Sequence, residues 1–320
     1  MPALAAPASL KGVLTPHDAA AQLAGGFRAA GVDAAELPVA DGGEGTAAVV
    51  HAALGGAWRA ADVHDALGRP VTARWLVLDD GTAVVDSAEA IGLPQVGEER
   101  DPLRATSRGL GELLGTVLGG RPAAVLVCVG GTATVDGGAG MIAALDAAAF
   151  AVPVRVACDV RNPLLGERGA ARVFAPQKGA DARAVEELEA RLAARADLAP
   201  YRHLRGAGAG GGLGAAFASL GAELLDGAEL VLELVGFDAA ARDADLVVTG
   251  EGTVDATTFE GKAPGAVARH CARLGVPCAL FGGVVRDGID AHVLSGDPDR
   301  AAADLFELGE RLGRGLVAPR

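Results

Sequence analysis

Residues 245–281 read DLVVTGEGTVDATTFEGKAPGAVARHCARLGVPCALF, and this stretch decides the fold class. Its two ends, residues 245–249 and 276–281, are short apolar runs typical of buried strands. Residues 265–274 between them have the apolar spacing of a helix. A strand, a helix and a second strand in this order predict a right-handed crossover unit of a parallel sheet.

Strand-like and helix-like segments alternate through the rest of the chain. Two short strands are expected, with a hairpin that turns at Asp79-Asp80-Gly81 and several Ala/Leu-rich helices. The strands are 124–129 and 154–158, the hairpin is 71–85, and the helices are 18–30, 110–118, 181–195 and 213–225. This alternation predicts an α/β protein. A length of 320 residues favours two domains, or one large α/β unit.

Composition excludes several classes of protein. The formal net charge of −13 argues against nucleic acid as a partner, because binding to a phosphate backbone needs a basic surface. No apolar run reaches the roughly 18–20 residues of a membrane span, and the N-terminal residues do not resemble a signal peptide. The four cysteines form no CxxC pair, which favours free thiols in a reducing compartment. A cytoplasmic protein is expected.

The chain contains 25 arginines but three lysines, namely Lys11, Lys178 and Lys262. Each lysine stands beside a glycine. They are either chance surface residues or positions that need a compact ammonium group, which arginine does not replace. In the second case they mark loops where the backbone comes close to a ligand.

Three glycine-rich segments are candidate ligand loops: DGGEGT at 41–46, GGTATVDGGAG at 130–140 and GEGTVDATTFEGK at 250–262. Two of them follow predicted strands, and open α/β sheets bind ligands at the carboxyl ends of their strands. A helix that begins there offers free N–H groups to a phosphate.

Five acidic residues lie beside glycines in these segments: Asp41, Glu44, Asp136, Glu251 and Asp255. Capping of a helix or a turn could explain Asp136 or Asp41 alone. Together with the isolated lysines, the five acids fit magnesium ligands and a general base around a phosphate group better.

Other catalytic patterns fail. Gly261-Lys262 is followed by alanine, so it is not a phosphate-binding P-loop. Gly206, Gly208 and Gly211 match the dinucleotide pattern formally, but no strand is predicted before them. No HExxH or GxSxG motif is present, which disfavours a zinc enzyme or a serine hydrolase.

Taken together, the loops make the chain resemble the bacterial glycerate kinase family over nearly its whole length. The matching stretches include SLKGVLT at 9–15, VADGGEGT at 39–46, VGGTATVDGGAGM at 129–141, FAPQKGA at 174–180 and VVTGEGTVDATTFEGKAP at 247–264. The resemblance implies transfer of the γ-phosphoryl group of ATP to D-glycerate with Mg²⁺, giving ADP and phosphoglycerate, more often 2-phosphoglycerate. It also implies a cleft between two α/β domains.

The fold expected is a Rossmann/flavodoxin-like domain with a second, mixed-sheet α/β domain inserted into it. Residues 1–61 and 244–320 are assigned to the first domain and 62–243 to the inserted one. No oligomeric state is assigned. The catalytic candidates are Asp136, Asp41, Lys262 and Lys11, with either aspartate as the base. The ATP-binding candidates are Gly130, Gly131, Thr132, Gly137, Gly138, Lys178, Gly250 and Gly252, and the metal ligands are Glu251, Asp255 and Glu44.

The chain departs from the family pattern at several of these loops. Ala8, Val135, Thr253 and Thr257 replace an expected Asp, Asn, Arg and Gln, and residues 1–7 make a poor strand. The chain is also shorter than the pattern between residues 146 and 152. If the replaced groups are needed, the alternative is a catalytically weak or non-catalytic relative that binds a nucleotide or a small hydroxy acid.

Overall fold

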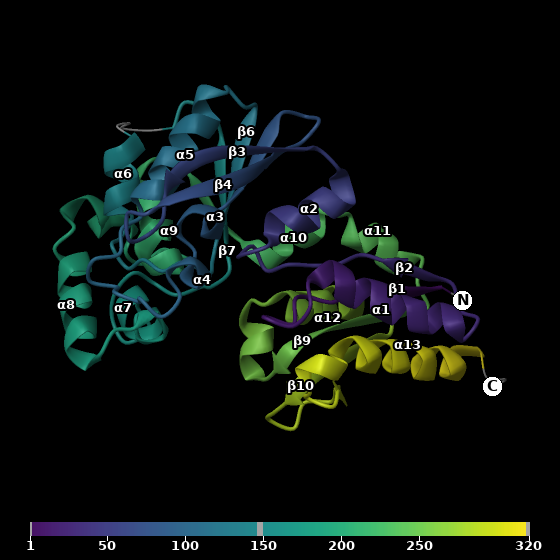
Figure 1. Cartoon of the computed structure of the whole chain (residues 1–320). Coiled ribbons are helices and arrows are strands. Elements are labelled where there is room, and N and C mark those ends of the chain that lie inside the picture. The colour runs from purple at the N-terminus through teal and green to yellow at the C-terminus, as the bar shows by residue number, and fades with distance from the viewer. Residues whose placement is uncertain (1, 146–149, 318–320) are drawn as a thin grey trace. The chain divides into compact units, whose positions relative to one another are not determined.

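The computed structural model describes residues 2–145 and 150–317 (Figure 1). The chain forms two compact units. Unit 1 comprises the described residues up to Asp41 and from Ala228 onward, and unit 2 is Gly42–Gly227. The predicted shortening between residues 146 and 152 falls mostly outside the described residues.

The limits of the units differ from the predicted boundaries at 61/62 and 243/244. A boundary after residue 61 would divide β3 (Ala57–His64), which pairs along its whole length with β4 (Pro70–Val77) of unit 2. At the other end, Glu229 of α10 (Gly227–Leu234) bonds to α12 of unit 1, so residues 228–243 belong with unit 1.

Unit 1 is built on a wholly parallel five-stranded sheet with the strand order β11-β10-β9-β1-β2. Its strands are β1 (Ala3–Ala5), β2 (Ala34–Glu36), β9 (Leu246–Val254), β10 (Cys278–Val285) and β11 (His292–Val293). The expectation of a poor first strand is wrong, because β1 pairs with both β2 and β9. Its alanines are at most 1% exposed, so burial by neighbours stabilises a segment with little strand propensity of its own.

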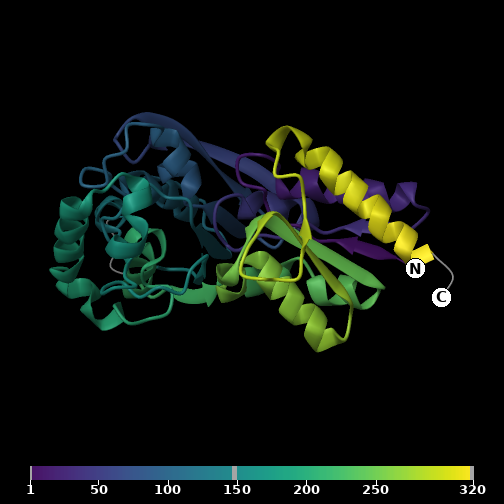
Figure 2. The same ribbon diagram turned by 90° about the horizontal axis from the view of Figure 1, so that it is seen from below.

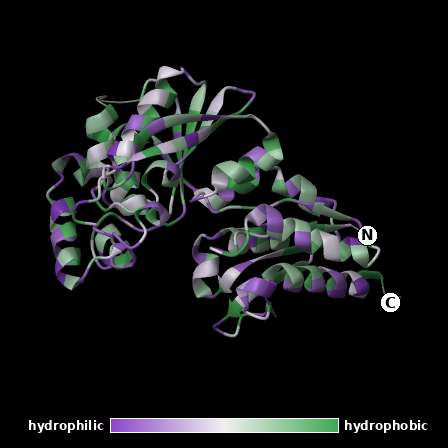
Figure 3. Ribbon diagram, viewed as in Figure 1, coloured by the Kyte–Doolittle hydropathy of each residue, from purple (hydrophilic) through white to green (hydrophobic). Residues whose placement is uncertain are grey.

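Helices cover both faces of this sheet. Figure 2 shows α1 (Pro16–Ala29) and α13 (Ala301–Val317) on one face and α12 (Ala263–Leu274) on the other. The remaining helical segments of unit 1 are α10, α11 (Phe237–Arg242), η3 (Ala256–Glu260) and η4 (Pro298–Arg300). Figure 3 shows hydrophobic residues alternating with hydrophilic ones along α13, as expected of a helix that packs on a sheet.

The predicted strand–helix–strand unit is confirmed as β9, α12 and β10, with β9 and β10 parallel. The third glycine segment, however, is not wholly a loop. β9 continues through Gly250 to Val254, because this part of the strand still pairs with β10 up to Val285.

Unit 2 contains a mixed six-stranded sheet with the order β3-β4-β5-β6-β7-β8. β3, β4 and β5 (Thr82–Asp86) are antiparallel, which confirms the predicted hairpin. β5, β6 (Ala124–Val129), β7 (Val154–Cys158) and β8 (Glu223–Asp226) are parallel. The predicted strands at 124–129 and 154–158 are confirmed, whereas β3 was not predicted because most of its residues are exposed and three of these are polar or charged.

Many short helices surround this second sheet. They are α2 (Thr46–Leu54), α3 (Ala88–Ile91), α4 (Leu93–Val96), α5 (Arg108–Gly119), α6 (Ala139–Leu145), α7 (Ala170–Phe174), η1 (Pro176–Lys178), α8 (Ala182–Ala193), η2 (Ala196–Tyr201) and α9 (Ala209–Ser219). The helix predicted over 213–225 is too long, because the chain turns at Gly221 and continues as β8. Among the described residues, no helix has both the length and the apolar character to cross a membrane.

Candidate functional site

In unit 1, three predicted site residues gather near the carboxyl end of β9. Glu251 Oε1 accepts hydrogen bonds from Thr258 Oγ1 at 2.7 Å and from Lys262 Nζ at 3.3 Å. Burial raises the pKa of Glu251 and the nearby Asp41 carboxylate adds to this rise, while Thr258 and Lys262 oppose it. The side chain of Glu251 is 15% exposed, so a charged group is held here with limited access to water.

Asp255 has a different place in the same segment. Its side chain accepts a hydrogen bond from the backbone N–H of Thr257 at 2.9 Å and caps η3. The hydrogen bond from the Thr257 side chain is the main cause that lowers the pKa of Asp255. Asp255, predicted as a metal ligand, is therefore the N-cap of η3 in this structure.

The segment after β1 is fixed to β9 by backbone contacts. The buried Thr249 Oγ1 donates to Ala6 O at 2.6 Å, and Ala8 N donates to Gly250 O at 2.9 Å. A Cβ on Gly250 would lie 2.2 Å from Phe281 O, so Gly250 allows two strands to pack closely. Lys11 follows in an exposed turn and, within the described residues, makes no hydrogen bond or ion pair.

In unit 2, the loop at 130–140 begins beside two carboxylates. A Cβ on Gly130 would lie 2.6 Å from Asp159 Oδ2, and one on Gly131 would lie 2.7 Å from Glu44 Oε2. The absence of side chains at these two glycines is what admits the carboxylates. Asp159 follows β7 and was not predicted, although VACD at 156–159 is an acid directly after a buried strand, as in the predicted loops.

Lys178 stabilises the same loop from inside the unit. Its Nζ donates to Thr132 Oγ1 at 3.1 Å and to Thr134 O at 2.8 Å. The residue is 3% exposed. Burial lowers the pKa of Lys178 to about 8, against the attraction of Asp159 and Asp136. Lys178 is thus a buried positioning group for the loop.

Asp136 is fully engaged within the protein. Its carboxylate accepts hydrogen bonds from Ser107 N and Ser107 Oγ, both at 2.8 Å, from Gly138 N at 3.0 Å and from Gly140 N at 3.1 Å. Two of these donors are the amides at the beginning of α6. The backbone amides of Gly138 and Gly140, which the sequence predicts as phosphate ligands, therefore donate to the Asp136 carboxylate.

The later glycines of this loop serve close packing. Gly137 and Gly138 have φ values of 61° and 69°, and a Cβ on Gly138 would lie 2.4 Å from Ala216 Cβ. Gly137 N also donates to Gly211 O at 3.1 Å. Gly137 and Gly138 thus pack closely against other parts of unit 2, and Gly138 lies against α9.

The dinucleotide-like glycines are explained in the same way. A Cβ on Gly211 would lie 2.0 Å from Thr134 O, and one on Gly208 would lie 2.3 Å from Pro163 O. The segment before them is η2, not a strand. This pattern is a packing motif between α9 and its neighbours.

Asp86 is the functional-site candidate that the sequence analysis missed. It ends β5, is 5% exposed, and accepts hydrogen bonds from Gly45 N at 3.0 Å and Ala47 N at 3.1 Å. Burial raises the pKa of Asp86 to about 7, although these amides favour the ionised form. Asp86 thereby fixes the loop that carries Glu44. Its position after the apolar run TAVV was the available signal.

A pocket of about 310 Å³ in unit 2 joins several of these groups. Glu44 and Asp86 line it together with Trp58, Arg74 and Glu89. The Arg74 guanidinium lies 5.0 Å from the centre of the Trp58 ring and 3.0 Å from Glu89. The pocket offers one cation and three carboxylates to a small polar ligand.

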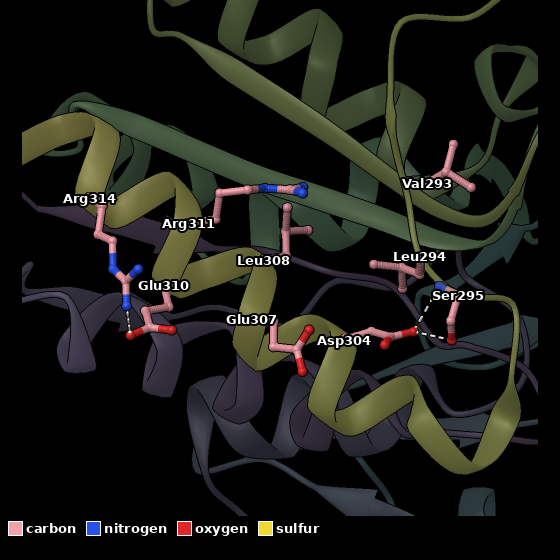
Figure 4. A pocket seen from close by; sticks show the side chains of 9 residues that line it. All are labelled: Val293, Leu294, Ser295, Asp304, Glu307, Leu308, Glu310, Arg311 and Arg314. Atoms are coloured by element: carbon pink, nitrogen blue, oxygen red, sulfur yellow. Dashed lines mark hydrogen bonds and ion pairs between the residues drawn. The ribbon is translucent and has the colours of Figure 1, made fainter.

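A larger hollow of about 590 Å³ in unit 1 lies beside α13 (Figure 4). Among its lining residues, Ser295 N donates to Asp304 at 2.8 Å, and Arg314 pairs with Glu310. None of the predicted site residues lines this hollow.

A preformed metal centre is absent from the described ranges, 2–145 and 150–317. There, no three His, Cys, Asp or Glu side chains lie close enough together to hold a metal ion. Of the predicted metal ligands, Glu251 and Asp255 belong to unit 1 and Glu44 belongs to unit 2.

The residues that depart from the family pattern have structural uses here. Val135 is 1% exposed and lies in the apolar core of unit 2. Thr257 supplies the amide and the hydroxyl that bond to Asp255. Ala8 contributes its backbone N–H to Gly250.

Comparison with known proteins decides the family. A family model described as the glycerate kinase family matches residues 3–152 and 146–298. The chain belongs to the glycerate kinase family. This confirms the resemblance drawn from the loops, and the family's match covers both units.

Named relatives agree with this membership. A glycerate kinase of Bacillus subtilis (strain 168) is 39% identical and covers 91% of this chain and 89% of its own length. A glycerate 2-kinase of Escherichia coli (strain K12) is 38% identical, with 89% and 85% covered. A crystal structure of a Salmonella typhimurium LT2 protein assigned as glycerate kinase 2 has a TM-score of 0.83 at 34% identity, covering 99% of this chain and 98% of that one. This glycerate kinase family fold is the α/β architecture that the sequence predicts.

Proposed function

We propose that the protein is an ATP-dependent kinase that phosphorylates D-glycerate at its 2-hydroxyl, giving 2-phosphoglycerate and ADP. The observation that carries this proposal is the similarity to glycerate kinases along nearly the whole chain. The 2-position is supported by the name of the Escherichia coli relative, glycerate 2-kinase.

The group around Glu251 is the proposed reaction centre. Asp41 is the preferred base, because Asp136 already accepts four hydrogen bonds within the loop. Asp41 would take the proton of the glycerate hydroxyl while that oxygen bonds to the γ-phosphorus and ADP leaves. Lys262 and Lys11 would neutralise charge on the transferred phosphoryl group, since such transfer depends mainly on positioning and charge stabilisation.

Of the three predicted metal ligands, Glu251 is the one we propose for Mg²⁺, because Asp255 caps η3 and Glu44 belongs to unit 2. In the described part of the chain, Glu251 Oε2 takes no hydrogen bond, and the burial of this carboxylate favours a cation beside it. Protein sites often hold Mg²⁺ with one or two carboxylates plus the substrate phosphates. Glu251 would hold the ion, which would neutralise phosphate charge.

In unit 2, the loop at 130–140 is the proposed phosphate-binding loop. Gly130, Gly131 and Thr132 are its proposed contact residues, and Lys178 is a positioning residue that holds Thr132. Glu44 and Asp86 belong to the neighbouring pocket, whose single arginine suits the carboxylate of a hydroxy acid.

A coupled assay of ADP release with D-glycerate, L-glycerate and other small hydroxy acids tests this function. We expect release that needs D-glycerate and Mg²⁺, with the product identified as 2-phosphoglycerate by NMR. Lys262→Ala and Asp41→Asn should each lower kcat at least about a hundredfold. Arg273→Ala removes a cation from the helix that follows Lys262 and is the control, because Arg273 pairs with Asp238 and not with the site.

Absence of ADP release with D-glycerate would overturn the proposed activity. Unchanged turnover in both Lys262→Ala and Asp41→Asn would instead leave the activity and remove the residue assignment.

A further inference from the structure

A small pocket of about 120 Å³ lies in unit 1 where four strands of the parallel sheet end. Gly252 comes from the end of β9 and Val284 from the end of β10. Lys11 comes from the segment after β1, and Leu294 directly follows β11. Ligands of open parallel α/β sheets bind at this edge.

The pocket has a floor of bare backbone. A Cβ on Gly283 would lie 3.0 Å from Gly252 O, so these two glycines of β10 and β9 are adjacent. A Cβ on Gly252 would meet no atom within 4 Å. Two neighbouring strands therefore present peptide groups without side chains, which is a surface on which a flat ring can lie.

The walls are apolar and partly exposed. Val13 and Val284 are 39% and 43% exposed, and Leu10, Leu294 and Pro298 complete the walls. A flat apolar ligand would cover this surface, and the burial of apolar area favours binding.

The two acids of the pocket are occupied by the protein. Asp304 accepts a hydrogen bond from Ser295 N at 2.8 Å and faces Arg300 Nε at 3.4 Å. Asp297 accepts from Asp299 N at 3.0 Å and caps η4. Neither carboxylate is therefore arranged to bind a cationic ligand.

Lys11 adds a positive charge to the lining of the pocket. Its side chain is exposed at the pocket and forms no ion pair with any described residue. A ligand that suits this arrangement has a flat, neutral part and an anionic part beside it. A purine nucleotide has both.

We propose that this pocket holds the adenine base of the nucleotide, with Lys11 contacting its phosphates. The inference rests on the proposed function for the identity of the nucleotide, and it adds the place of the base. None of the other pockets described above combines bare strand ends, apolar walls and an unpaired ammonium group.

Calorimetric titration with ADP and with inorganic tripolyphosphate separates the base from the phosphates. Val284→Trp fills the pocket from an exposed strand position and should weaken ADP binding at least about tenfold. It should leave tripolyphosphate affinity unchanged, since that probe has no base. Val293→Trp is the matched control, because Val293 is 65% exposed on β11 and lines the neighbouring hollow instead.

Gly252→Val provides a second, independent variant that adds bulk to open space on a strand. It should also weaken ADP binding and spare tripolyphosphate. Thermal unfolding of each variant shows whether the fold is kept, and the inference is judged on the variants that keep it.

Equal ADP affinity in wild type, Val284→Trp and Gly252→Val would overturn the base site, as would a wild-type protein that binds no ADP. The same preparations are assayed for turnover of D-glycerate. Normal turnover with an unchanged KM for ATP in both variants means that the base site fails and the kinase stands. ADP binding that both variants weaken, without turnover in wild type, supports the base site and rejects the kinase.

Discussion

The three lysines of this arginine-rich chain occupy three different environments. Lys178 is buried and donates to two oxygens of one loop, Lys262 is partly buried beside Glu251, and Lys11 is exposed. A buried site with room for a compact ammonium group cannot take the larger guanidinium without disturbing its neighbours. The reading of lysine as a required group is therefore best supported at Lys178.

Lys178→Arg should lower the free energy of unfolding by about 1–3 kcal/mol, because the larger side chain overpacks a well-filled interior. Lys11→Arg changes an exposed residue in the same way and should stay within about 0.5 kcal/mol of wild type. Urea unfolding at neutral pH measures both. Equal stability of the two variants would contradict the view that Lys178 is a tightly enclosed group.

Asp86 should make stability depend on pH. Its folded pKa of about 7 exceeds the ordinary value of 3.8, so between these values the folded protein keeps a proton that the unfolded chain releases. The free energy of unfolding therefore falls as pH rises through this window, by at most about 4 kcal/mol. Asp86→Ala should lack this fall.

Urea unfolding of wild type and Asp86→Ala across this pH range measures the difference. Asp62→Ala, on the exposed side of β3, is the control and should keep the wild-type slope. Parallel profiles for wild type and Asp86→Ala would show that Asp86 titrates at an ordinary pKa.

At the level of single residues, sequence identifies candidates better than it identifies roles. Glu251, Lys262 and Asp41 were predicted, and their proximity follows from strand ends meeting at one edge of a parallel sheet. Asp136 was predicted as a base, and two of its four hydrogen bonds come from Ser107, 29 residues away, which no local pattern reveals. Asp86 was missed because its partners lie on a distant loop.

Among the elements, the contact between α1 and α13 depends on glycine. A Cβ on Gly26 would lie 2.0 Å from Phe306 O, and one on Gly309 would lie 2.2 Å from Leu23 O. Each helix thus presents bare backbone to the other, which brings the two helices close together on one face of the sheet of unit 1.

Gly26→Ala should destabilise the protein by about 1–3 kcal/mol, since the new methyl group meets backbone that cannot rotate away. Gly25→Ala is the neighbouring control, because its Cβ would lie 3.4 Å from the Phe306 side chain, an ordinary contact. That control should be neutral or should stabilise α1 by up to about 1 kcal/mol, as alanine favours helix over glycine. Thermal unfolding distinguishes them, and equal melting temperatures would contradict the close contact.

Elements with strong apolar periodicity were predicted well from sequence, as β6, β7, α5 and α12 show. Those that depend on their neighbours were not. β1 is the short segment Ala3-Leu4-Ala5 between two strands, and β8 begins where helical composition continues past Gly221. In both cases tertiary pairing overrides local propensity.

At the scale of the whole molecule, each unit has an apolar core of its own. One core cluster draws its buried residues from within 63–220 and another from within 3–32 and 248–308. Neither cluster crosses the limits of its unit. Such independence is the property expected of separately folding domains.

A fragment of residues 42–227 should therefore fold alone into the six-stranded sheet unit. Circular dichroism should show mixed helix and strand content, and urea should unfold the fragment in one cooperative transition. A fragment that unfolds without cooperativity, or that binds hydrophobic dye like a molten globule, would contradict an independent core. The full chain measured in parallel is the reference.

The two ends of unit 2 are neighbours: a Cβ on Gly42 would lie 2.6 Å from Gly227 Cα. The polypeptide thus leaves unit 1 and comes back at one point, through two residues that have no side chains. Joined there directly, the flanking segments would restore an uninterrupted parallel-sheet protein. In evolutionary terms, a single connection point allows the sequence of unit 2 to be lengthened, shortened or exchanged while the sheet of unit 1 keeps its strand order.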